Sequence, residues 1–136
     1  MARPHPLSTR LGRRRADMDL VRDASGSIAE LSAALDRQLG SEVRPGERMR
    51  MLRETTNQVT RIANDAVQAY GRVRSTITSE LDRPEGDRPG ARQMQSDLSR
   101  SRADVLRALE AMKERYAWGY PGSTQTEDPE PAIDVE

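Results

Sequence analysis

The stretch over residues 48–81, which contains no proline and a single glycine, constrains the fold of this chain more than any other feature. Its less polar residues recur at alternating steps of three and four, which is the spacing of a coiled-coil-like helix. They are Met49, Leu52, Thr56, Val59, Ala63, Ala66, Tyr70, Val73 and Ile77, and Ile62 and Ala69 widen the stripe on one side. A helix of this length would span about 50 Å. Because so long a stripe cannot be buried by one helix alone, we expect other helices to pack along it.

Two further segments carry stripes with the same periodicity. The first holds Met18, Val21, Ala24, Ile28, Leu31, Leu35 and Leu39. The second holds Met94, Leu98, Ser101, Val105, Ala108, Leu109, Met112 and Tyr116. The pattern predicts helices over about 17–39, 46–82 and 88–118, and the short loops between them favour antiparallel neighbours. We therefore expect an all-α fold: an elongated antiparallel three-helix bundle, or a coiled-coil-like hairpin with the first helix folded against it.

Prolines and glycines indicate where these helices begin and end. Gly40 is a plausible stop for the first helix, and Pro45 suits the first turn of the second. Pro84 forbids continuation of the second helix, and Asp87 can cap the third. Gly26 interrupts the first helix, but the stripe stays in phase across it, which favours one continuous helix.

The apolar content is low for a globular domain. Leu, Ile and Val make up about one residue in six, and there is no Phe. The formal net charge is zero, which argues against disorder of the whole chain. A core this thin is marginal for a monomer, so we expect a homo-oligomer or a complex with a protein partner.

The two ends of the chain carry opposite charges. Residues 1–16 have no acid and read as a flexible basic arm that can become helical near residues 7–11; its arginines are Arg3, Arg10, Arg13, Arg14 and Arg15. Residues 119–136 read as an acidic, disordered tail. The basic arm can be a solvated tail, or it can contact phosphates of a nucleic acid or an acidic protein surface. No aromatic residue lies among its arginines to stack on bases.

Three of the four aromatic residues cluster at the predicted end of the third helix. They are Tyr116, Trp118 and Tyr120. One interpretation is a plug that closes the end of the bundle. The other is an anchor for a protein partner, because Trp and Tyr carry much of the binding energy at interfaces.

No pattern in the chain indicates catalysis or a bound cofactor. There is no Cys, and His5 is the only His, which excludes disulfides and the usual zinc sites. No apolar run reaches the length of a membrane-spanning helix. We expect a non-enzymatic assembly or adaptor protein with no cofactor and no metal, in the cytoplasm or in a virion, and possible roles include a phage or bacterial structural component. The alternative is a nucleic-acid-binding accessory protein that uses the basic arm.

Overall fold

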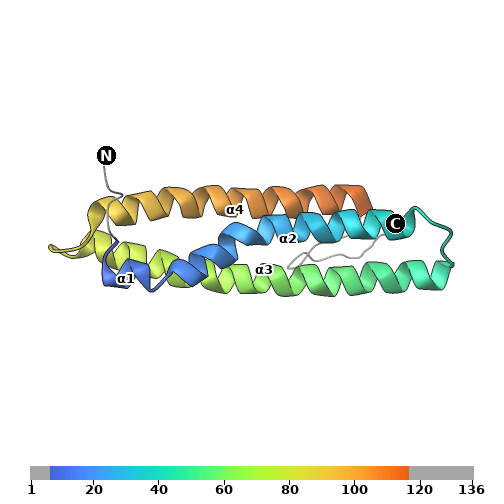
Figure 1. Cartoon of the computed structure of the whole chain (residues 1–136), viewed down its shortest axis with the longest axis horizontal. Coiled ribbons are helices and arrows are strands. Elements are labelled where there is room, and N and C mark those ends of the chain that lie inside the picture. Colours follow the sequence, from blue (N-terminus) through green and yellow to red (C-terminus); the bar gives the residue numbers. More distant parts are fainter. Residues whose placement is uncertain (1–6, 117–136) are drawn as a thin grey trace, which may run out of the picture.

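A computed structural model describes residues 7–116, and in this part of the chain helices joined by short turns and loops are the whole of the regular secondary structure. Its helices are α1 (Thr9–Gly12), α2 (Arg15–Leu39), α3 (Pro45–Asp82) and α4 (Arg88–Tyr116). The three long helices lie side by side, and the chain reverses direction at each loop between them (Figure 1). The prediction of an all-helical chain is confirmed for these residues. Arg3, Trp118, Tyr120 and the acidic tail over residues 119–136 lie outside them.

The predicted signals at the ends of the helices hold with one exception. Pro45 occupies the first turn of α3, and α3 ends at Asp82, before Pro84. An Asp87 carboxylate oxygen accepts a hydrogen bond from the Gly90 N–H at 3.0 Å and so caps α4. The exception is the conformation of Gly40: α2 stops there, as predicted, but Gly40 keeps a right-handed conformation with φ −74° instead of the left-handed one of a typical glycine stop. The end of α2 therefore does not depend on a left-handed glycine.

Helix α2 is continuous through Gly26, as the unbroken phase of its stripe predicts. Val21, Ala24 and Ile28 are all buried, so the same face of the helix points to the core on both sides of the glycine. The helix begins at Arg15, two residues before the predicted start.

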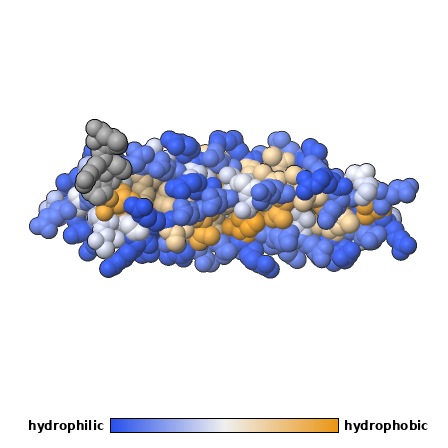
Figure 2. Space-filling view, viewed as in Figure 1, coloured by the Kyte–Doolittle hydropathy of each residue, from blue (hydrophilic) through white to orange (hydrophobic). Residues whose placement is uncertain are grey.

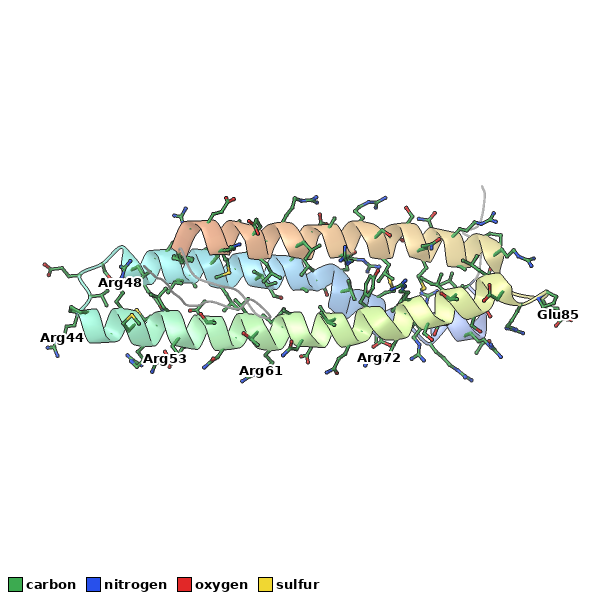
Figure 3. The ribbon with its side chains drawn as sticks, turned by 180° about the vertical axis from the view of Figure 1, so that it is seen from behind. Arg44, Arg48, Arg53, Arg61, Arg72 and Glu85 are labelled. Carbon is green, nitrogen blue, oxygen red and sulfur yellow. The ribbon has the colours of Figure 1, made fainter. Side chains whose placement is uncertain are left out.

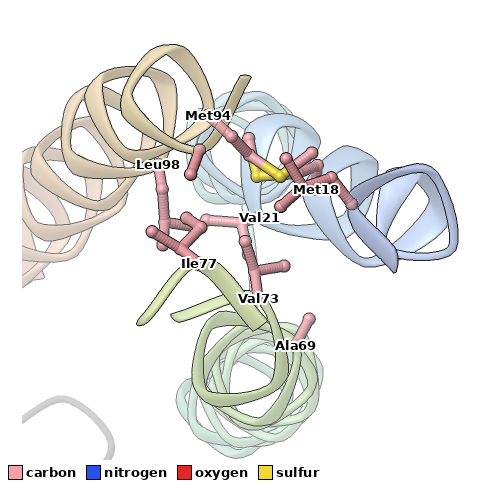
Figure 4. Close-up of a cluster of buried hydrophobic side chains, with 9 residues drawn as sticks. Met18, Val21, Ala69, Val73, Ile77, Met94 and Leu98 are labelled. Atoms are coloured by element: carbon pink, nitrogen blue, oxygen red, sulfur yellow. The ribbon is translucent and has the colours of Figure 1, made fainter. Parts of the chain in front are cut away.

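The core consists of two apolar clusters along the long axis. One lies near α1 and the α3–α4 loop, where side chains from α2, α3 and α4 meet (Figure 4); its buried members are Leu11, Met18, Val21, Ala69, Val73, Ile77, Ala91, Met94 and Leu98. The other contains Ile28, Val59, Leu109 and Met112. On α3 the buried positions between the two clusters are Ala63 and Ala66. The core is thus narrowest at its middle.

The predicted stripe of α3 lies mostly against its neighbours. Its buried members are Val59, Ala63, Ala66, Val73 and Ile77, and Leu52 and Tyr70 are half-buried. The prediction is wrong at the start of the stripe, where Met49 is 58% exposed and Thr55 is buried instead of Thr56. The reason for Met49 is geometric: α3 extends beyond the described part of α4, so no residue of α4 up to Tyr116 covers its first turns (Figure 1).

The prediction of a flexible arm is wrong for residues 7–16. This segment forms α1 and the start of α2, and Leu11 is fully buried among residues of the first core cluster. Ser8 starts α1 as its N-cap, because its hydroxyl oxygen accepts a hydrogen bond from the Leu11 N–H at 3.2 Å. Burial of Leu11, together with hydrogen bonds from this segment to α3 and the α3–α4 loop, holds residues that the basic composition alone assigns to solvent.

Among the helices that the structure describes, none is long and apolar enough to cross a membrane.

Candidate functional site

A groove lies between α3 and α4, and its walls are mainly apolar. Its volume is about 310 Å³, and its lining includes Ala63 and Ala66 from the floor and Val67 and Leu106 from the rims. Val67 is 68% exposed and Leu106 is 47% exposed, although both are large apolar residues. Because alanine side chains are small, the α3 wall of the groove is shallow. Val67 and Leu106 at its rims therefore remain exposed to solvent.

A stripe of positions on the outer side of α3, next to this groove, carries no charge between its two ends, and the exposed residues Arg61, Asp65, Arg72 and Arg74 flank it. We define the outer α3 face as the exposed or half-buried positions spaced three and four residues apart on the side of α3 away from the core: Arg53, Asn57, Thr60, Asn64, Val67, Gln68, Gly71, Ser75, Thr78 and Asp82. Only its two end residues are charged, in a chain in which 32% of residues are charged. The Thr60 hydroxyl donates to the Thr56 carbonyl oxygen at 2.7 Å, so its proton is satisfied within the helix. Depletion of charge is typical of the centre of a protein interface.

No contact within the described residues explains why position 71 on this face is a glycine. A Cβ atom added there would meet nothing within 4 Å, and the same holds for Gly26 on α2. Glycine in the middle of a helix costs about 1 kcal/mol relative to alanine. The described residues therefore do not explain why this position lacks a side chain.

Apolar side chains also gather on the face seen in Figure 2, in a band bordered by polar residues. Between α2 and α3 lies a second, more open hollow of about 680 Å³, whose lining includes Leu31 and Ile62. Its lining also includes the charged residues Glu30, Arg37 and Arg61.

A buried polar junction holds α1 to the α3–α4 loop. Glu80 is fully buried, and one carboxylate oxygen accepts hydrogen bonds from the Ser8 hydroxyl at 2.8 Å and from the Asp87 N–H at 3.2 Å. The other oxygen pairs with Arg83 at 2.7 Å. An Asp87 carboxylate oxygen accepts from the Ser8 N–H at 2.9 Å. The hydrogen bond from Ser8, followed by those from Asp87 and Arg83, lowers the pKa of Glu80.

This junction predicts the acid sensitivity of the fold. A carboxyl group with a lowered folded-state pKa stabilises the fold above its unfolded-state pKa, and this contribution is lost as the pH falls through the folded-state pKa. We expect the free energy of unfolding to fall below about pH 4.5. The fall should be smaller in Glu80→Gln, as measured by urea denaturation between pH 3 and 7. Identical pH dependence in the two proteins would contradict an ionised Glu80 at the junction.

The predicted basic residues separate into two groups. Arg10 donates to the Ser79 hydroxyl at 3.2 Å, and Arg14 donates to the Thr76 hydroxyl at 3.0 Å, so both bind α3. Arg14 also pairs with Asp17 at 3.4 Å. Arg13 and Arg15 are exposed and make no ion pair within residues 7–116. Within residues 7–16, Arg13 and Arg15 are thus the arginines whose guanidinium groups bind no other described residue.

Asp17 links α2 to α3. Its carboxylate accepts two hydrogen bonds from Arg72, at 2.8 and 3.1 Å. The hydrogen bonds from Arg72, with a smaller effect of the nearby Arg14, lower the pKa of Asp17.

Further arginines follow the outside of α3 towards its N-terminus (Figure 3). Arg50 lies 4.0 Å from Glu47 and 3.7 Å from Glu54, so its charge is compensated. In contrast, the exposed residues Arg44, Arg48, Arg53 and Arg61 have no carboxylate partner within the described part of the chain.

Tyr116 is half-buried and joins the end of α4 to α2. Its hydroxyl forms hydrogen bonds with the Ser32 carbonyl oxygen, at 3.1 Å, and with the Asp36 carboxylate. Arg115 donates to the same carboxylate at 2.7 Å. The hydrogen bonds from Arg115 and then Tyr116 lower the pKa of Asp36, and burial followed by the bond to Asp36 raises the pKa of Tyr116. These contacts hold Tyr116 against α2, whereas Trp118 and Tyr120 are not among the described residues.

Comparison with known proteins finds no relative of this chain. No protein-family model, no curated protein and no solved structure matches this chain. The function must therefore be argued from the surfaces described above.

Proposed function

We propose that this chain is a non-enzymatic helical assembly or adaptor protein. It self-associates or docks on a larger protein assembly, in the cytoplasm or in a virion. A structural component of a phage or of a bacterial assembly is one such role. Its working unit is an elongated antiparallel three-helix bundle with coiled-coil-like seams. The observation that carries the proposal is the uncharged outer α3 face beside an open apolar groove, with Val67 and Leu106 exposed on the rims.

The physical argument concerns the thin core. Exposed apolar surface next to uncharged polar surface is typical of a site that another protein covers. In the middle of α3 the buried side chains are alanines, which contribute little burial energy. An additional helix on α3 would add the contacts that this region lacks, so association also stabilises the fold.

Multi-angle light scattering of the full chain tests this proposal. We expect a molar mass of at least twice that of one chain at micromolar concentrations, falling towards the mass of one chain on dilution. A single-chain mass at every concentration up to about 100 μM, together with no protein recovered by a pull-down, would contradict the proposal.

A second candidate function is nucleic-acid binding, favoured by the unpaired Arg13, Arg15, Arg44, Arg48 and Arg61. Arginine side chains without carboxylate partners are free to contact phosphates, and such binding weakens steeply with salt. Substitutions test this better than deletion of residues 1–16, because the deletion also removes Leu11 from the core.

Fluorescence anisotropy with labelled DNA and RNA oligonucleotides would measure this binding at 50 and 200 mM salt. If the candidate is right, Arg44→Gln with Arg48→Gln weakens binding and reduces its salt dependence. Equal affinity of the wild type and this variant would exclude a contribution from these residues.

A further inference from the structure

The outer α3 face has the symmetry of a surface that pairs with itself. Its positions are spaced identically in both directions from a centre between Val67 and Gln68. When two copies of α3 lie antiparallel about this centre, Asn64 of one copy faces Gly71 of the other, and Asn57 faces Thr78. A two-fold dimer interface requires this kind of self-complementary surface.

The charges at the two ends of the face complete this pairing. In the same register, Arg53 of one copy faces Asp82 of the other, and the pair occurs at both ends of the interface. Neither Arg53 nor Asp82 has an ion-pair partner within residues 7–116 of its own chain. A parallel pairing would instead bring Arg53 against Arg53 and Asp82 against Asp82, which is unfavourable.

Gly71 gives an independent indication. A side chain at position 71 would meet open space within the single chain, yet the residue is a glycine, which lowers the stability of the helix relative to alanine. A partner helix that approaches α3 closely would explain the missing side chain. The hollow between α2 and α3 has no such self-complementary pattern, and charged residues border it.

We infer that a second copy of this chain packs antiparallel along the outer α3 face, centred between Val67 and Gln68, with Arg53 of each copy paired to Asp82 of the other. This inference rests on the proposed self-association and specifies its geometry. The interface is an elongated helix pair of about 45 Å, with uncharged residues along its length and ion pairs at its ends.

Charge exchange tests the register. Arg53→Asp and Asp82→Arg each place like charges together at both ends of the interface, and the double variant restores opposite charges. Sedimentation equilibrium of the full chain at 50 mM salt should show the Kd of the dimer raised about tenfold by each single substitution. The double variant should return to within about threefold of the wild type. Arg37→Asp on α2 changes the net charge equally and should leave the Kd unchanged.

The outcomes separate this inference from the proposed function. If the wild type self-associates but the single substitutions have no effect, or the double variant is weaker than both, the proposed geometry is wrong and self-association stands. If the wild type remains a single chain at all concentrations, both are wrong.

Gly71 provides a second test that does not involve charge. Gly71→Gln adds a long side chain on the outer α3 face, whereas Gly26→Gln adds it to open space on α2. Both variants should fold at least as stably as the wild type, because glutamine is the better helix former. Only Gly71→Gln should weaken the dimer, by at least fivefold. Equal association of the two variants would contradict close approach at Gly71.

Discussion

Leu11→Ala should lower the free energy of unfolding by about 3 kcal/mol, within the range for loss of a fully buried leucine. Leu11 is fully buried in the first core cluster, where it packs with residues of α2, α3 and α4. The substitution removes these contacts and leaves a cavity under α1. Urea denaturation followed by circular dichroism would measure the effect.

Leu20→Ala is the matched control for this prediction. Leu20 lies on α2 and is 46% exposed, so its truncation removes less buried surface and should cost less than about 1 kcal/mol. Equal effects of the two substitutions would mean that α1 is not packed on the bundle in solution. A flexible arm over residues 7–16 would then be the better description.

Gly86→Ala should also destabilise the fold strongly, by about 3 kcal/mol. A Cβ atom at position 86 would lie 1.8 Å from the Glu80 carbonyl oxygen, which is backbone and cannot rotate away. The α3–α4 loop would have to move, and this movement would disturb the hydrogen bond from the Asp87 N–H to Glu80. Overpacking of this kind commonly costs 1–3 kcal/mol, and the disturbed buried carboxylate adds to it.

Gly26→Ala is the control for the loop glycine. Its Cβ atom would meet nothing within 4 Å, so the same chemical change should raise the free energy of unfolding by about 1 kcal/mol. Thermal denaturation of both variants would compare them directly. A Gly86→Ala variant as stable as the wild type would show that the loop does not approach Glu80 so closely.

Local patterns in the sequence predict most of the helical structure. The three stripes, Pro45, Pro84 and the cap at Asp87 are features of neighbouring residues. They place the start of each long helix, and the ends of α2 and α3, within two residues of the described bounds, whereas the predicted end of the third helix lies outside the described residues. The continuity of α2 across Gly26 follows from the phase of its stripe alone. Such patterns show which face of a helix is apolar, and this face is the one that packs against the neighbouring helices.

The features that the sequence does not predict depend on pairs of residues far apart in the chain. The Glu80 junction joins Ser8 to Glu80 and Asp87, and no local pattern indicates that a glutamate at the end of a helix will be buried. The sequence allows a helix near residues 7–11, and Ser8 three residues before Leu11, an N-cap ahead of an apolar residue, is a local signal for the start of α1. The outer α3 face was also missed, because a search for apolar stripes ignores a stripe of uncharged small and polar residues.

Distances between spin labels would measure the proposed antiparallel pairing most directly. The chain contains no Cys, so Gln68→Cys and Thr78→Cys each provide one labelling site on the outer α3 face. Antiparallel pairing predicts a short distance between the two labels at 68, below about 20 Å, because the helix axes lie 8–10 Å apart. The two labels at 78 should be more than about 30 Å apart along the helix axis. Short distances at both positions would indicate parallel helices, and no dipolar coupling at either position would show that α3 does not pair with a second copy.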